Sequence, residues 1–202
     1  MNDKTEKEAD FGYKKVNPNE KPDLVKGVFD SVANKYDLMN DLMSVGIHRL
    51  WKKATVQMSN LKENDTVLDV AGGTGDLAIL FSEIVGERGK VFLSDINEQM
   101  LEIGRDRVLD SGLLNVKTLV ADAEDLPFPD NSFDCISIAF GIRNVTNKDK
   151  ALKEFNRCLK PNGRSLVLEF SKPASSLVSD LYDLYSFNVL PHLGQWIAGD
   201  SD

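Results

Sequence analysis

An apolar run that ends in glycines is the feature of this chain that most limits its fold. The run covers residues 66–71, and the residues from 76 onward are typical of a helix. Between them stands a glycine-rich loop, made of Gly72, Gly73, Thr74 and Gly75. Glycines let the backbone turn sharply and approach a ligand with no Cβ in the way. The sequence therefore predicts a strand, a ligand-facing loop and a helix, which together are typical of the mouth of a nucleotide-type cofactor site.

Acidic residues around this loop indicate the charge of its ligand. Asp69 precedes the first glycine by three residues, and Asp76 follows the last one directly. A pyrophosphate at a helix N-terminus needs bare amides, whereas carboxylates favour an ammonium or a sulfonium. Asp95 follows Gly75 by 20 residues, after a second apolar run, where a carboxylate can accept hydrogen bonds from two ribose hydroxyls. S-adenosylmethionine has both cations and a ribose, so we expect it to bind Asp69, Asp95 and the glycine-rich loop.

Alternative interpretations of these residues stay open at this point. Gly73, Gly75 and Ala78 also fit the glycine pattern of dinucleotide-binding proteins, which would make the protein an NAD-dependent oxidoreductase. Asp69 could instead order the loop, and Asp95 could cap the helix that follows it. The acidic charge beside the loop favours S-adenosylmethionine over a dinucleotide.

Strands and helices alternate along the chain from Thr66 onward. We expect strands at 66–71, 90–95, 116–121, 133–139 and 164–170, and helices at 76–85, 97–110 and 147–159. Asn97 is expected to cap the second of these helices, and Gly104 would allow it to pack closely on the sheet. This alternation predicts parallel βαβ units in an α/β, Rossmann-like, doubly wound sheet that is mostly parallel, with helices on both faces. Residues 1–22 are polar and are expected to form a flexible tail, followed by a single domain over residues 23–202.

Loops that follow the carboxyl ends of parallel strands face the ligand in such folds. The loop after strand 116–121 is acidic and contains prolines. We expect Asp122 to accept a hydrogen bond from an adenine amino group while Ala123 packs near the ring, although a solvated acidic loop is the alternative. Ala139, at the start of the ligand-facing loop 139–144, completes the expected cofactor site.

Composition excludes several other classes of protein. The 202 residues are 42% hydrophobic, enough for the core of one domain. A net charge of −8 argues against a nucleic-acid partner. Cys135 and Cys158 are expected in the core, and the two histidines are too far apart for a zinc site, so we expect no metal. No window approaches the roughly 20 apolar residues of a membrane span, and the acidic first ten residues argue against a signal peptide.

Three further blocks of sequence are specific enough to indicate a family. The first runs from Val28 to Trp51 and contains Tyr36, Asp37, Met39, Asn40, Ser44 and His48. The second covers residues 140–145, and the third runs from Arg157 to Gly163 and on to Glu169 and Ser171. With the glycine-rich loop, these blocks resemble the ubiquinone/menaquinone biosynthesis C-methyltransferase family of class I S-adenosylmethionine-dependent methyltransferases. Cys158 and Asn162 stand where the family usually has valine and glycine, and neither touches the chemistry.

The resemblance implies methyl transfer from S-adenosylmethionine to a ring carbon of a prenylated quinol. The acceptor would be demethylmenaquinol, 2-polyprenyl-6-methoxy-1,4-benzoquinol, or both. Arg143 is then our candidate catalytic residue, because a guanidinium can stabilise a developing phenolate, with an ordinary surface ion pair as the alternative. His48 is expected to be structural rather than a base.

The resemblance also divides the domain. Residues 23–60 would form a helical extension that acts as a lid and substrate segment, residues 61–171 the cofactor-binding core, and residues 172–202 a second helical substrate segment. Tyr36, Asp37 and Asn40 would belong to the lid. Apolar residues at helical spacing would form either a tunnel for the isoprenoid tail or, as we favour, plain core; they are Met39, Leu42, Met43, Trp51, Tyr185, Phe187, Val189, Leu190, Leu193, Trp196 and Ile197.

A prenylated acceptor implies where the protein works. We expect a protein of the bacterial cytoplasm that associates transiently with the inner face of the cytoplasmic membrane, alone, as a homodimer or within a biosynthetic complex. The family pattern continues past Asp202 with another helix and a closing antiparallel strand pair, which are therefore expected to be missing. An inactive or accessory methyltransferase-like fragment remains an alternative for this reason.

Overall fold

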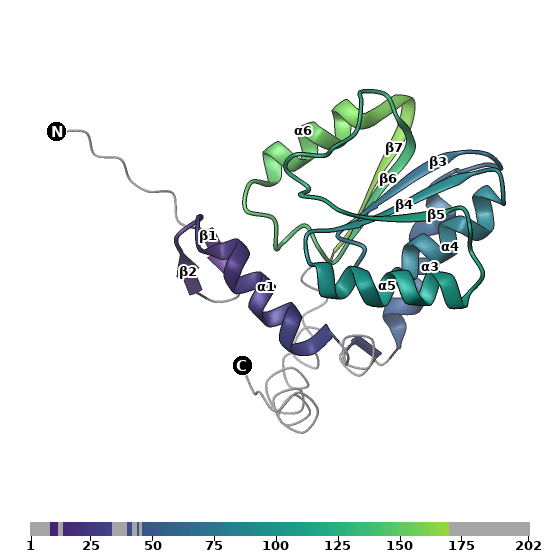
Figure 1. Ribbon diagram of the computed structural model, residues 1–202. Coiled ribbons are helices and arrows are strands. Elements are labelled where there is room, and N and C mark those ends of the chain that lie inside the picture. The colour runs from purple at the N-terminus through teal and green to yellow at the C-terminus, as the bar shows by residue number, and fades with distance from the viewer. Residues whose placement is uncertain (1–8, 12–13, 34–39, 42–43, 45, 170–202) are drawn as a thin grey trace, which may run out of the picture.

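A five-stranded parallel sheet forms the centre of the computed structural model, which describes all residues except 1–8, 12–13, 34–39, 42–43, 45 and 170–202. The sheet order is β5-β4-β3-β6-β7 (Figure 1). Its strands are β3 (Thr66–Val70), β4 (Lys90–Asp95), β5 (Val116–Val120), β6 (Phe133–Ala139) and β7 (Leu159–Leu168). The helices that connect or flank them are α3 (Ile47–Met58), α4 (Asp76–Val85), α5 (Glu98–Asp110) and α6 (Lys148–Cys158). The predicted doubly wound fold is confirmed.

Strand β3 lies in the middle of the sheet and pairs with β4 on one side and β6 on the other. The chain winds outward from β3 through β4 to β5, and then returns to form β6 and β7 on the opposite side. The strand order therefore reverses between β3 and β6. In open α/β sheets the crevice at the carboxyl ends of the strands at this point is where ligands bind.

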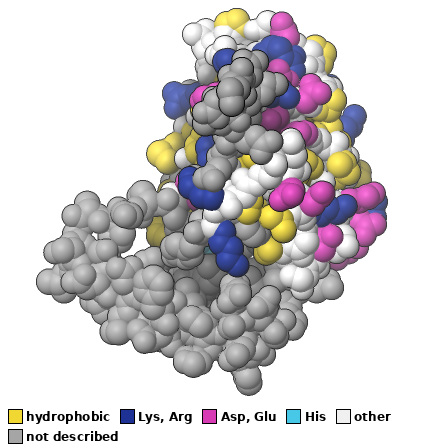
Figure 2. Space-filling model, turned by 90° about the vertical axis from the view of Figure 1, so that its left-hand side faces the viewer, with side chains coloured by type: hydrophobic (Ala, Val, Ile, Leu, Met, Phe, Trp, Pro, Cys, Tyr) yellow, Lys and Arg dark blue, Asp and Glu magenta, His cyan; other side chains and the backbone are white. Residues whose placement is uncertain are grey.

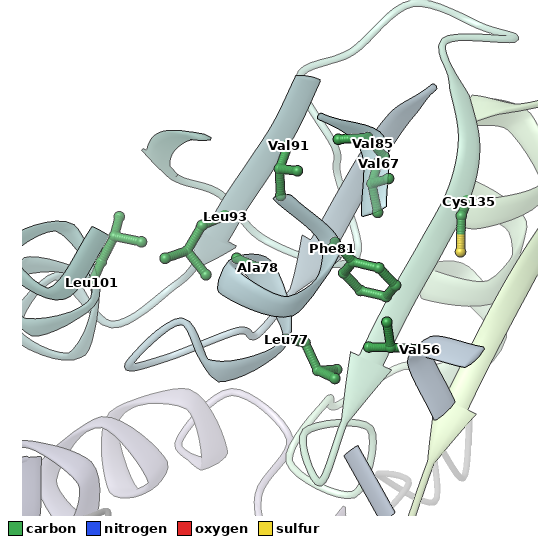
Figure 3. Close-up of a cluster of buried hydrophobic side chains, with 10 residues drawn as sticks. All are labelled: Val56, Val67, Leu77, Ala78, Phe81, Val85, Val91, Leu93, Leu101 and Cys135. Carbon is green, nitrogen blue, oxygen red and sulfur yellow. The ribbon is translucent and has the colours of Figure 1, made fainter. Parts of the chain in front are cut away.

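Helices cover both faces of the sheet because alternate residues of its central strands are apolar on both sides. Val67 of β3 belongs to a cluster with Leu77 and Phe81 of α4 and with Val56 of α3, shown in Figure 3. The next residue, Leu68, points to the other face and packs in a second cluster with Phe155 of α6. The central strands are buried on both sides, as expected of a parallel sheet covered by helices.

Helix caps fix where the helices after β4 and β6 begin. The side chain of Asn97 accepts a hydrogen bond from the amide of Met100 at 3.0 Å, and Asn147 does the same for Lys150 at 3.0 Å. Strand β7 begins at residue 159, five residues before its predicted start. The backbone becomes extended directly after α6, and Leu159 pairs with Phe133 before a register shift in the ladder.

The N-terminal part differs from the expected tail without regular structure. The strands β1 (Ala9–Phe11) and β2 (Lys14–Val16) pair antiparallel, and α1 (Lys21–Val32) begins at residue 21. Pro22 lies in the first turn of α1, where its missing amide hydrogen costs nothing. Short strands that pair through their backbones leave little signal in side-chain pattern, which is why the sequence did not reveal them.

Candidate cofactor-binding site

The glycine-rich loop joins β3 to α4 at the reversal of the strand order. A Cβ atom on Gly72 would overlap Leu93 and lie 2.6 Å from the Oδ2 atom of Asp69. A Cβ on Gly104 of α5 would lie 2.6 Å from the carbonyl oxygen of Gly73, so the predicted close packing of Gly104 is confirmed, here against the loop. The loop therefore lies too close to Asp69, Leu93 and α5 to leave room for a side chain at Gly72 or Gly104.

Asp69 is a buried carboxylate beneath this loop, with 1% of its surface exposed. Its Oδ1 atom accepts a hydrogen bond from the Ser137 hydroxyl at 2.7 Å, whereas Oδ2 has no hydrogen-bond partner among the described residues. Burial raises the pKa of Asp69 to about 7, although the Ser137 hydroxyl and the charge of Lys52 oppose the shift. An unpartnered buried oxygen is costly unless a ligand completes it.

Asp76 does not contribute free negative charge to the loop, which corrects one step of the sequence argument. Its carboxylate lies 2.7 Å from the Nζ atom of Lys52 and 2.7 Å from the Nη2 atom of Arg107. Burial alone would raise its pKa, but the two cations hold the pKa of Asp76 at about 2. Of the two acids beside the loop, only Asp69 remains for a cationic ligand.

Asp95 ends β4 and holds the backbone on both sides of the cleft. Its Oδ2 atom accepts a hydrogen bond from the amide of Gly73 at 2.9 Å, and Oδ1 accepts one from the amide of Asn97 at 2.8 Å. Burial raises the pKa of Asp95, while these backbone amides oppose the shift. The cap of α5 is Asn97, so the alternative of Asp95 as the helix cap is wrong.

A cleft of about 330 Å³ opens at the carboxyl ends of the strands, and a smaller hollow of about 30 Å³ adjoins it. The cleft brings together five of the predicted cofactor residues: Gly73, Asp95, Asp122, Ala123 and Ala139. The hollow is lined by Asp69, Gly72 and Thr74, together with Gly73 and Ala139. Gly75 lines neither space; it is the left-handed N-cap residue of α4.

Asp122 lies on the rim of the cleft, exposed to solvent. Its Oδ1 atom accepts a hydrogen bond from the amide of Glu124 at 2.8 Å, which orders the turn after β5. Ala123 is 8% exposed and packs into the core on the α6 side of the sheet. The adenine-binding role of both residues stays a prediction.

Arg143 follows β6 but does not line the cleft. Its side chain is 49% exposed, and its Nη1 atom lies 2.6 Å from the Oε1 atom of Glu169. This is the surface ion pair that the sequence left open as an alternative. Neighbours of Arg143 in the same loop, Gly141 and Asn144, do line the cleft.

The sequence missed one wall of the cleft, which is formed by α1. Pro22, Val25, Lys26 and Phe29 line it from this helix. Lys21 is 2% exposed, and its Nζ atom donates hydrogen bonds to the carbonyl oxygens of Arg143 at 3.1 Å and Val145 at 3.3 Å. The start of α1 is thereby fixed to the loop after β6.

The other end of α1 is tied to the opposite side of the cleft. The Nδ2 atom of Asn97 donates a hydrogen bond to the Oδ1 atom of Asp30 at 2.8 Å. A further wall residue that the sequence missed is Phe140, which has a φ of +56° and lines both spaces. Positive φ is uncommon for a bulky residue and occurs often at ligand sites.

His48 lies outside both spaces. It is 4% exposed, its Nδ1 atom lies 2.7 Å from the Ser44 hydroxyl, and burial lowers its pKa. This environment fits a structural histidine. Tyr36, Asp37, Met39, Leu42, Met43 and residues 172–202, to which the sequence assigned lid and tunnel roles, lie outside the described residues.

These residues fit S-adenosylmethionine better than a dinucleotide. Asp69, whose Oδ2 atom has no hydrogen-bond partner in the described part of the chain, is among the residues that line the hollow beside the glycine-rich loop, where a carboxylate would attract an ammonium and repel a pyrophosphate. Asp95 stands at the cleft as an acceptor for ribose hydroxyls. The cleft volume is in the range of small-molecule sites.

Comparisons with known proteins agree with this chemistry. Residues 14–202 match the ubiE/COQ5 methyltransferase family. The ubiquinone/menaquinone biosynthesis C-methyltransferase UbiE of Idiomarina loihiensis is 59% identical over all of this chain and 81% of its own length. UbiE of Teredinibacter turnerae is 61% identical over 95% of this chain and 78% of its own length.

Among solved structures, a SAM-dependent methyltransferase from Aquifex aeolicus is similar, with a TM-score of 0.60 and 30% identity over 69% of this chain and 75% of that one. The protein is an S-adenosylmethionine-dependent methyltransferase, and S-adenosylmethionine is its methyl donor. The sequence match over nearly the whole chain, the fold and the acidic cleft lead to one conclusion: this chain belongs to the ubiE/COQ5 methyltransferase family.

Proposed function

We propose that this protein transfers a methyl group from S-adenosylmethionine to a ring carbon of a prenylated quinol in ubiquinone or menaquinone biosynthesis. The acceptors would be demethylmenaquinol and 2-polyprenyl-6-methoxy-1,4-benzoquinol. The buried, unpartnered Oδ2 atom of Asp69 carries the donor half of this proposal. Relatives that are 59% and 61% identical and are named for quinone biosynthesis support the acceptor half. An NAD-dependent oxidoreductase is not favoured, because Asp69 lies where a pyrophosphate would need bare amides.

Different residues of the cleft and the hollow bind different parts of S-adenosylmethionine. Asp69 accepts a hydrogen bond from the α-ammonium of the methionine moiety, and the backbone of residues 72–74 lies against that moiety. Asp95 uses the remaining lone pairs of its carboxylate for the ribose hydroxyls, while Asp122 and Ala123 contact the adenine. Support comes from the lining of the two adjoining spaces, which contains all of these residues.

The chemical step needs little beyond alignment and charge stabilisation. When bound, S-adenosylmethionine supplies a methyl group on a positively charged sulfur. A ring hydroxyl of the quinol loses its proton, and the ring carbon beside it forms a bond to the methyl carbon as the methyl–sulfur bond breaks. The ring carbon then loses its proton to solvent and the oxygen regains one, so the products are the methylated quinol, S-adenosylhomocysteine and one proton. Holding the two carbons in line at near-attack distance is the protein's main contribution.

Arg143 stabilises the phenolate in this proposal. A guanidinium has five N–H donors in a planar fork, so it can bind a quinol oxygen while its Nη1 atom stays on Glu169 at 2.6 Å. The loop that carries Arg143 is held by Lys21 from α1, and its residues Gly141 and Asn144 line the cleft, which supports a position of Arg143 beside it. Arg143→Ala should therefore lower kcat about 10- to 100-fold and leave the affinity for S-adenosylhomocysteine unchanged.

The control for that variant is Arg105→Ala on α5, since Arg105 is 54% exposed and its ion pairs with Glu102 and Asp106 are both as long as 3.9 Å. A normal kcat for Arg143→Ala would remove Arg143 from the mechanism. A matching loss of cofactor affinity would mean that Arg143 acts on the cleft instead of on the acceptor.

The location of the reaction follows from the acceptor. A prenylated quinol partitions into the bilayer, so we place the protein in the bacterial cytoplasm, working at the inner face of the cytoplasmic membrane. None of the helices in the described ranges is long and apolar enough to cross a membrane. Leu24 and Val28 of α1 are 41% and 49% exposed, and Figure 2 shows hydrophobic side chains exposed among charged ones on one face. Leu24 and Val28 are one helical turn apart, so their exposed apolar surface is continuous along α1, and this supports contact with lipid.

A methyl-transfer assay tests the substrate. The protein is incubated with methyl-labelled S-adenosylmethionine and a chemically reduced, short-chain analogue of each quinol, and label in the ring-methylated product is measured. Labelling of either quinol, and of neither oxidised quinone, is expected, because only the hydroquinone can form the nucleophilic phenolate. No labelling of either quinol by protein that binds S-adenosylhomocysteine would overturn the proposed acceptor and leave the donor assignment intact.

A further inference from the structure

A buried lysine lines the same hollow as Asp69. Lys52 comes from α3 and is 8% exposed, with its Nζ atom 2.7 Å from the Oδ2 atom of Asp76. The hollow that it shares with Asp69 also has Gly72, Gly73 and Thr74 in its wall. A lysine ammonium is almost never buried to this degree without anionic partners.

The ion pair with Asp76 does not use all the capacity of this ammonium. Asp76 already receives a second cation, since the Nη2 atom of Arg107 lies 2.7 Å from its Oδ1 atom. An ammonium has three N–H donors, and the hydrogen bond to Asp76 is the one that Nζ makes among the described residues. Lys52 therefore retains two donors and positive charge for a further anion.

The hollow thus contains a buried anion and a buried cation side by side. Asp69 has an oxygen without a partner, and Lys52 has donors without partners, in the described part of the chain. A ligand that satisfies both must carry a positive and a negative group a short distance apart. The free end of the methionine moiety is such a zwitterion, with an α-ammonium and an α-carboxylate on one carbon atom.

We propose that Lys52 binds the α-carboxylate of the methionine moiety of S-adenosylmethionine, opposite the ammonium that Asp69 binds. This inference rests on the role of Asp69 in the proposed function. It gives α3 a binding role, because Lys52 is the one cationic side chain among the described residues that line the hollow. The competing explanation is that Lys52 only fastens α3 to Asp76.

Ligands with and without the amino-acid end distinguish these explanations. S-adenosylhomocysteine carries the zwitterion, whereas 5′-methylthioadenosine keeps the adenosine and the thioether and lacks the zwitterion. By calorimetry, Lys52→Met should weaken S-adenosylhomocysteine binding about 10- to 100-fold, the range of a charge-assisted hydrogen bond. The same variant should bind 5′-methylthioadenosine within about twofold of the wild type. Lys53→Met, which removes an exposed charge from the next position of α3, is the matched control and should change neither affinity.

Equal weakening of both ligands by Lys52→Met would show a structural role and overturn the inference, and so would no weakening of either. If Lys52→Met does not fold, decarboxylated S-adenosylhomocysteine tests the wild type directly, because it keeps the ammonium and lacks the carboxylate. The wild type should bind this analogue at least about tenfold more weakly than S-adenosylhomocysteine, and equal affinity would overturn the inference. Failure of the wild type to bind S-adenosylhomocysteine at all would instead contradict the donor site itself.

Discussion

Asp69→Asn should make the protein more stable at pH 8 and less able to bind its methyl donor. The buried carboxyl of Asp69 has a pKa of about 7 in the folded protein, compared with an ordinary value of 3.8. In the unfolded chain it is ionised above about pH 4, so between about pH 4 and 7 the folded state binds more protons than the unfolded state. The free energy of unfolding therefore falls as pH rises through this window. Replacing the carboxyl by a neutral amide of the same shape removes that loss.

The size of the effect follows from the shift. About three pKa units correspond to about 4 kcal/mol of lost stability at pH 8, since each unit is about 1.4 kcal/mol. The amide introduced at this position would still accept the hydrogen bond from Ser137, but its buried N–H group would lack a partner at a cost of about 1–3 kcal/mol. A net gain of about 1–3 kcal/mol remains, which raises the Tm of a domain of this size by about 2–12 °C.

Thermal unfolding followed by circular dichroism from about pH 4.5 to pH 8 measures this difference. The Tm of the variant should rise above that of the wild type as pH increases through the pKa of Asp69. Asp95, whose pKa is also raised by burial, and Asp76, whose pKa is about 2, are present in both proteins. Their contributions to the pH dependence therefore cancel in the Tm difference. At pH 8, saturating S-adenosylhomocysteine should raise the Tm of the wild type above that of the variant, because it stabilises the wild type alone. A Tm difference that does not change between pH 5 and pH 8 would refute the reasoning.

Two further variants test the cleft. Asp95→Ala should weaken S-adenosylhomocysteine binding at least about tenfold in calorimetry, since it removes the ribose acceptor and the partner of the Gly73 amide; unchanged affinity would exclude Asp95 from the site. Gly104→Ala should lower the free energy of unfolding by about 1–3 kcal/mol in urea titration, because the new Cβ would lie 2.6 Å from the Gly73 carbonyl oxygen. Unaltered stability would mean that the loop and α5 are not packed as closely as described.

Patterns within single segments predicted most of the sheet and its helices. The period of apolar residues placed β6 at 133–139 and α4 at 76–85, as observed. Asn97 was predicted as the cap of its helix and is confirmed by its hydrogen bond to Met100. The glycine spacing likewise located the loop, because the strand, the glycines and the helix follow one another within one segment of the chain.

Contacts between distant segments could not be predicted in the same way. Nothing in the sequence distinguishes Lys21 from the other lysines, and its burial depends on carbonyl groups more than 120 residues away. The neutralisation of Asp76 depends on Lys52 and Arg107, which approach it from two different helices. Charge counted along the chain overstated the negative charge at the loop, because ion pairing is decided only by the tertiary fold.

The contact of α1 with the loop after β6 also has a consequence for biosynthesis. Helix α1 leaves the ribosome early, but the carbonyl groups that bury the Lys21 ammonium belong to residues 143 and 145. The helix must therefore wait, with Val25 and Phe29 more exposed than their half-buried state in the folded protein, until the strands on both sides of β3 have been translated. Contacts of such long sequence separation form late, and exposed apolar surface in the interval invites aggregation or chaperone binding. The part of the chain that is made early is thus among the last to reach its final place.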